Sequence, residues 1–100
     1  MPILIAFTKS PSKGKKYVLR FENPKATIHF GSDVSTTYVE GADETTRNNY
    51  IKRHTVNEDW SNINAGSASR YILWGDHKNI KKNLKSFIKR FGIHDNRKKY

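Results

Sequence analysis

The sequence contains no cysteine, only three prolines and no long hydrophobic run. Without thiols the chain forms neither disulfides nor thiolate metal sites. No apolar stretch approaches the ~18 residues needed to span a bilayer, so we expect no transmembrane helix. The last helix lacks the exposed Trp or Leu wedge of membrane-surface helices, so we do not expect membrane contact. The six glycines stand apart from one another and do not form a glycine-rich phosphate loop.

Groups suited to catalysis are also sparse. His54 and Glu58 are four residues apart, as are His29 and Asp33, but a zinc site needs three or four ligands. The serines are not set in the strand–turn–helix pattern of a nucleophile elbow. We therefore predict that the protein is not an enzyme and needs no metal or cofactor.

Charge is present in excess and unevenly distributed. The net charge is +10, with six basic residues against one acid in residues 1–31, four against six in residues 32–75 and nine against two in residues 76–100. Two basic ends thus flank a mildly acidic middle. A basic domain of this kind is typical first of nucleic-acid binders and second of proteins that bind acidic surfaces.

The order of secondary structure predicts an α+β fold. A short apolar run rich in strand formers indicates a strand over 3–7, and alternating apolar residues indicate strands over 17–22 and 26–30, with a hairpin turn at 23–25. Helices follow over 44–54, from Ser67 to a left-handed Gly75, and from an Asp76 cap to Gly92, after which Ile93 folds back. We predict a small antiparallel sheet (the hairpin plus the N-terminal strand) packed by two or three helices, the last amphipathic. Residues 1–100 form one domain, with a mobile basic loop at 9–16 and a short basic tail at 94–100.

The final helix has two distinct faces. One face carries Ile80, Leu84, Phe87, Ile88 and Phe91 at helical spacing. The opposite face carries only lysines, and no acid occurs between residues 78 and 90. Like charges four residues apart destabilise a helix by roughly 0.2–0.5 kcal/mol per pair, a cost that a bound polyanion would remove. A purely solvated face is the alternative interpretation.

These patterns select a set of candidate nucleic-acid-binding residues. The main stripe lies on the lysine side of the final helix and consists of Lys78, Lys82, Lys85 and Lys89. Two residues flank it, Lys81 and Arg90, and three more come from the N-terminal loop: Lys13, Lys15 and Lys16. Lysines contact phosphates without reading bases. We assign Tyr50, Tyr71 and Trp74 to the core, and we expect Arg70 to make a cation–π contact with Trp74.

Seven short segments occur in one order between residues 16 and 91: Lys16-Tyr17-Val18-Leu19-Arg20-Phe21, His29-Phe30-Gly31, Tyr50-Ile51-Lys52-Arg53-His54, Glu58-Asp59-Trp60, Ala65-Gly66, Ser69-Arg70-Tyr71-Ile72-Leu73-Trp74 and Phe87-Ile88-Lys89-Arg90-Phe91. Together they resemble a family of small basic proteins encoded by giant viruses, the nucleocytoplasmic large DNA viruses. The resemblance implies a viral origin and a place in the virion or in the viral factory in the host cytoplasm or nucleus. It supplies no catalytic residues.

The sequence therefore predicts a virion-associated protein that binds nucleic acid, expected to be viral DNA, largely without sequence preference, in genome packaging or condensation. The alternative is a minor capsid or core protein that binds an acidic viral protein. An exposed edge of the N-terminal strand would also permit a homodimer by strand pairing.

Overall fold

Four strands form one mixed sheet in the order β3-β2-β1-β4. The structure is a computed structural model that describes residues 1–97. The strands are β1 (Ile3–Lys9), β2 (Lys15–Glu22), β3 (Ala26–Ser32) and β4 (His94–Asp95). The helical segments are the 3₁₀ turn η1 (Tyr38–Glu40), α1 (Glu44–Thr55), α2 (Ala65–Ala68), the π-helical turn η2 (Ser69–Leu73) and α3 (Ile80–Arg90).

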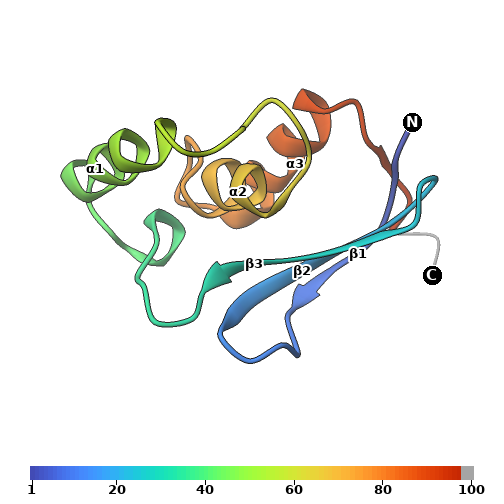
Figure 1. Ribbon diagram of the computed structural model, residues 1–100, viewed down its shortest axis with the longest axis horizontal. Helices are drawn as coiled ribbons and strands as arrows, with labels where there is room; N and C mark the ends of the chain where they lie inside the picture. The colour runs from blue at the N-terminus through green and yellow to red at the C-terminus, as the bar shows by residue number, and fades with distance from the viewer. Residues whose placement is uncertain (98–100) are drawn as a thin grey trace.

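The predicted α+β architecture is confirmed. β1 pairs antiparallel with β2, and β2 pairs antiparallel with β3 through a turn at residues 23–25. Leu19 and Phe21 alternate along β2 and enter the same core as the helices. The helical segments cover one face of the sheet, with α1 beyond one end of it (Figure 1). The core between these layers includes Phe30, Ile72 and Phe87, all fully buried.

The C-terminal tail is better ordered than predicted. His94 and Asp95 form β4, which runs parallel to β1 beside Ile3 and Leu4. The His94 amide donates to the Pro2 carbonyl at 2.9 Å, and the Asn96 amide donates to the Leu4 carbonyl at 2.9 Å. Only residues 98–100 of the predicted tail lie outside the described part of the chain. The start of the β1 edge, which in an exposed state would permit a homodimer by strand pairing, is thus already paired within the chain.

The basic loop predicted at 9–16 is also shorter than expected. Lys9 ends β1 and Lys15 begins β2, so only five residues connect the two strands. Backbone hydrogen bonds close this connection, from the Ser10 amide to the Lys16 carbonyl (3.0 Å) and from the Lys15 amide to the Ser12 carbonyl (3.2 Å). The segment is therefore a strand hairpin and not a long free loop.

Gly75 lies just after η2, and glycine is required there for a different reason than predicted. It is absent from the glycines with positive φ, which are Gly14, Gly31, Gly41 and Gly92. A Cβ atom at residue 75 would lie 2.3 Å from the Tyr71 carbonyl oxygen and 2.7 Å from Cγ of Asn83. Close packing therefore requires glycine at residue 75. Gly92 follows the end of α3 as predicted, and it is this glycine that adopts the left-handed conformation, with φ +61°.

The N-cap of α3 is Asn79 and not Asp76. Oδ1 of Asn79 accepts hydrogen bonds from the Lys81 amide (2.9 Å) and the Lys82 amide (3.1 Å), which satisfies two donors at the open helix end. Asp76 instead pairs with Arg47, at 3.0 Å between Oδ1 and Nη2. The prediction failed because both residue types cap helices, and the Arg47 guanidinium, distant in sequence, engages the aspartate.

Asn83 attaches α3 to the rest of the helical layer. Its side chain is almost completely buried, at 1% exposure. Nδ2 donates to the Ile72 carbonyl (2.9 Å) and the His77 carbonyl (2.7 Å), while Oδ1 accepts from the His77 amide (3.0 Å). One amide thus joins α3 to the end of η2 and to the connection between them.

Replacing Asn83 by leucine tests this attachment. The change preserves size but leaves buried carbonyl and amide groups without partners, so we expect a loss of at least about 2 kcal/mol in the free energy of unfolding. The matched control is Asn48→Leu on the exposed side of α1. Urea unfolding measures both. Equal stabilities of the two variants would show that the Asn83 bonds do not anchor α3.

The cap assignment is tested by comparing Asn79→Ala with Asp76→Ala. Loss of an N-cap side chain costs about 1 kcal/mol, whereas the exposed carboxylate of Asp76 forms a surface ion pair of much smaller value. We expect Asn79→Ala to lower the thermal unfolding midpoint more than Asp76→Ala does. The reverse order would restore Asp76 as the cap.

Candidate nucleic-acid interface

The burial pattern of α3 confirms its amphipathic character. Leu84 and Phe87 are buried in the core, and Ile80 and Ile88 are partly buried against it. Ile93 folds back beyond Gly92 as predicted, with its amide bonded to the Ile88 carbonyl at 3.0 Å. These contacts place the apolar side of the helix against the core and leave its opposite side to solvent.

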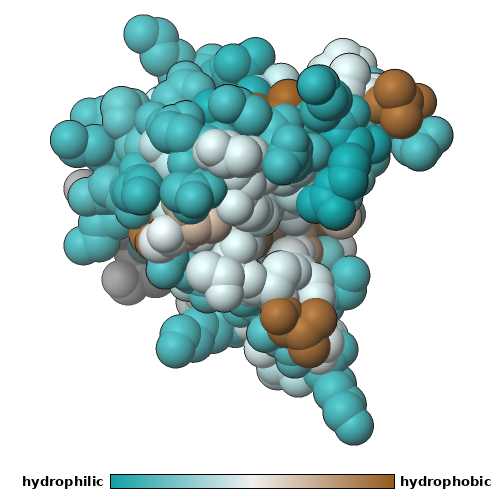
Figure 2. Space-filling model, turned by 90° about the vertical axis from the view of Figure 1, so that its left-hand side faces the viewer, coloured by the Kyte–Doolittle hydropathy of each residue, from teal (hydrophilic) through white to brown (hydrophobic). Residues whose placement is uncertain are grey.

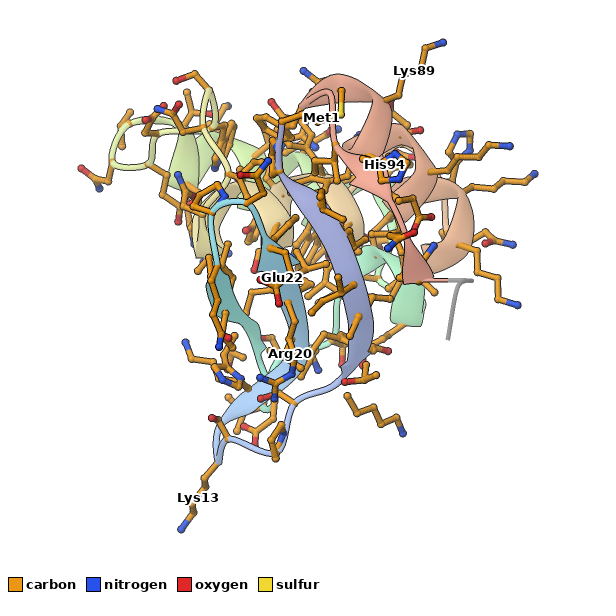
Figure 3. All side chains as sticks on the ribbon, turned by 90° about the vertical axis from the view of Figure 1, so that its right-hand side faces the viewer. Met1, Lys13, Arg20, Glu22, Lys89 and His94 are labelled. Atoms are coloured by element: carbon orange, nitrogen blue, oxygen red, sulfur yellow. The ribbon has the colours of Figure 1, made fainter. Side chains whose placement is uncertain are left out.

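Four lysines occupy the solvent side of α3 and are here called the α3 lysine face: Lys81, Lys82, Lys85 and Lys89. All four are exposed. Within residues 1–97, every ion pair between a basic side chain and a carboxylate lies elsewhere. Figure 3 shows nitrogen-tipped side chains projecting from this helix away from the sheet, with Lys89 at one end. The charge of the α3 lysine face is thus not neutralised by these carboxylates.

Lys78 and Arg90 differ from these four lysines. Lys78 precedes the helix, and its Nζ lies 5.1 Å from the centre of the Tyr38 ring. The Arg90 guanidinium lies 4.1 Å from the centre of the Tyr71 ring. The α3 lysine face, which includes the predicted flanking residue Lys81, therefore runs from Lys81 to Lys89, about 12 Å at 1.5 Å per residue.

The three lysines predicted from the N-terminal part lie apart from the α3 lysine face. Lys13 projects from the β1–β2 connection, at the opposite end of the view from Lys89 (Figure 3). Lys15 lines a separate cleft. Lys16 is largely buried and forms an ion pair with Glu40, at 3.1 Å between Nζ and Oε1. The fold therefore does not unite the nine predicted residues in one surface.

The cleft that Lys15 lines was not predicted from the sequence. It has a volume of about 400 Å³ and lies between the end of β3, α1 and the α2–η2 segment. Arg53, His54 and Glu58 also line it. Glu58 accepts a hydrogen bond from Nε1 of Trp60 (2.8 Å) and faces Nε2 of His54 at 3.8 Å. The spacing of His54 and Glu58 was the one sequence signal of this cleft.

Tyr50 closes part of the cleft from within an aromatic stack. Its ring lies parallel to that of Trp74, with centroids 4.3 Å apart, and 4.1 Å from the His54 ring. Tyr50 and Trp74 are both buried, which confirms their assignment to the core. Burial, reinforced by the nearby charge of Glu58, raises the pKa of Tyr50 to about 12.

No three His, Asp or Glu side chains in residues 1–97 are arranged to hold a metal ion, and no helix in that range is long and apolar enough to cross a membrane. The end of the molecule at which α1 lies is mainly hydrophilic, with a few separate hydrophobic spots (Figure 2).

A family described as a family of unknown function (DUF5754) matches residues 5–54. The chain belongs to this family. The DUF5754 match covers most of the sheet, η1 and nearly all of α1, and it ends at His54. The α3 lysine face therefore lies outside the matched segment, while Lys15, Arg53 and His54 of the cleft lie inside it.

No curated protein and no solved structure matches the chain. Membership of DUF5754 carries no activity, partner or viral source with it. The resemblance to giant-virus proteins and the location in a virion or viral factory thus remain predictions.

The environment of Tyr50 gives a pH prediction. The phenol of the unfolded chain ionises near its ordinary pKa of about 10, whereas the folded protein retains its proton to about pH 12. The contribution of the neutral Tyr50 phenol to the free energy of unfolding is complete below pH ~10 and is lost as the pH rises towards 12. Between about pH 8 and about pH 11, the free energy of unfolding in urea should fall more for the wild type than for Tyr50→Phe. Equal drops would contradict the buried, neutral phenol.

Proposed function

We propose that the protein binds nucleic acid through the α3 lysine face, by contacts to backbone phosphates with little sequence preference. The observation that carries this proposal is the separation of charges. The ion pairs of residues 1–97 neutralise cations on the sheet, on α1 and near the C-terminus but leave Lys81, Lys82, Lys85 and Lys89 exposed.

Without a bound anion, the adjacent lysine charges destabilise α3. Lys81–Lys85 and Lys85–Lys89 are like-charge pairs at i,i+4, each costing roughly 0.2–0.5 kcal/mol. Lys81 and Lys82 also lie in the first turn, where the helix dipole disfavours positive charge. A row of phosphates along the helix would convert these repulsions into attraction.

The size of the surface sets the number of contacts. The face is about 12 Å long, and successive phosphates of one DNA strand advance by about 3.4 Å along the duplex axis. Three or four phosphates are therefore within reach. Lysine ammonium groups act as flexible point charges, so they position the protein on the backbone and do not select bases.

This function accords with genome packaging or condensation in a virion, which we propose as its setting, with viral DNA as the partner. The role is one of binding, without catalysis. An acidic viral protein, as in a minor capsid or core component, is the partner that the test below would favour if nucleic acid does not bind.

The test compares two variants of equal charge. Lys81, Lys85 and Lys89 are changed to Glu in one, and the exposed Lys9, Lys25 and Lys52 in the other. Each set removes six units of positive charge and brings the net charge from +10 to +4. Fluorescence anisotropy with a random-sequence duplex of about 20 base pairs, at about 50 and about 200 mM salt, measures the affinity.

We expect wild-type binding to weaken steeply with salt, with a slope of log K against log salt of about −3 to −4. The α3 variant should lose most of its affinity and the control variant much less, while circular dichroism shows both folded. Equal losses would indicate a response to total charge alone and would contradict the assignment to α3. Absence of wild-type binding at low salt would reject nucleic acid as the partner.

A further inference from the structure

A small notch lies beside the α3 lysine face, between α3, η2 and the connection that joins them. It has a volume of about 50 Å³. Arg70 and Tyr71 line it from η2, Asp76 from the connection, and Ser86 and Arg90 from α3. Two arginines and a hydroxyl group from different elements thus line one small hollow that is open to solvent on one side.

The two guanidinium groups have most of their hydrogen-bond donors free. Nη1 of Arg70 donates to the Trp74 carbonyl at 2.9 Å. Nε of Arg70 is buried and has no partner, and within residues 1–97 no hydrogen bond is formed by the Arg90 side chain. A guanidinium offers five N–H donors in a planar fork suited to phosphate oxygens.

The charged side chains that line the notch, two arginines and one aspartate, carry a net positive charge. Both guanidinium carbons lie near the Tyr71 ring, at 5.0 Å from its centre for Arg70 and 4.1 Å for Arg90. The one carboxylate that lines the notch, Asp76, already pairs with Arg47. Burial, followed by the charge of Arg47, lowers the pKa of Arg70, and this lowering outweighs the nearby Asp76 carboxylate, which acts to raise it. The predicted cation–π contact of Arg70 with the Trp74 ring is replaced by cation–π contacts with the rings of Trp60 and Tyr71.

We propose that this notch binds a terminal phosphate monoester of a nucleic-acid strand whose backbone lies on the α3 lysine face. This inference rests on the proposed function. Since a buried water needs at least about 10–15 Å³, a space of about 50 Å³ accommodates one tetrahedral oxyanion. A backbone phosphodiester carries a sugar on both sides and needs two exits, whereas a terminal phosphate needs one. The small volume therefore favours the strand end.

The experiment uses the same duplex with 5′-phosphate, with 3′-phosphate or with hydroxyl ends. We expect the wild type to bind one phosphorylated form at least about fivefold more tightly than the hydroxyl form. Arg90→Gln should abolish this preference, because it removes a guanidinium that lines the notch. The fold should be retained, because Arg90 is exposed and lies outside the core. Arg20→Gln, which removes an exposed arginine from the sheet, should retain it.

A second measurement does not depend on any substitution. The Arg70 Nε–H resonance of the wild type should shift when the preferred phosphorylated duplex is added and should not shift with the hydroxyl duplex. Equal affinity for all three duplexes, with salt-sensitive binding intact, would overturn the notch proposal and leave the proposed function standing. Absence of binding to any duplex at low salt would overturn both.

Discussion

The buried amide of Asn83 is the contact on which the orientation of α3 depends. Apolar packing of Leu84 and Phe87 would hold the helix against the core over a range of rotations and shifts, because the hydrophobic effect is not directional. The three hydrogen bonds of Asn83 to Ile72 and His77 select one of these arrangements. The absence of a side chain at Gly75 makes room for this amide.

This anchor explains how the protein tolerates a row of adjacent lysines. The repulsion between Lys81, Lys85 and Lys89 acts on the solvent side, while the Asn79 cap and the core contacts stabilise the helix from its end and inner side. Exposed charges in water interact weakly, so a modest number of good contacts outweighs them. The chain can thus display concentrated positive charge on a rigid element, and the same anchor sets the distance between Arg90 on α3 and Arg70 on η2.

The sequence predicted the features that depend on local pattern. A short apolar run located β1, alternation located β2 and β3, helical periodicity located α3 with its apolar side, and Gly92 with Ile93 marked its end. Features that depend on distant partners were missed. The Lys16–Glu40 pair, the capture of Asp76 by Arg47 and the pairing of β4 with β1 join residues 24 or more positions apart. For the site, the lysines of α3 were predictable because they share one helix. The separation of Lys13, Lys15 and Lys16 from them was not, because it depends on how the sheet hairpin lies relative to that helix.

The parallel pairing of β4 with β1 brings the two ends of the described chain together. The residues from His94 to Asn96 run alongside those from Pro2 to Leu4, joined by backbone hydrogen bonds. A longer polypeptide that contained this unit would enter and leave it along the same edge of the sheet, a few residues apart along the strands. The unit could therefore be inserted into a surface loop of another protein without stretching its host, with α3 displayed on the helical layer that covers the sheet.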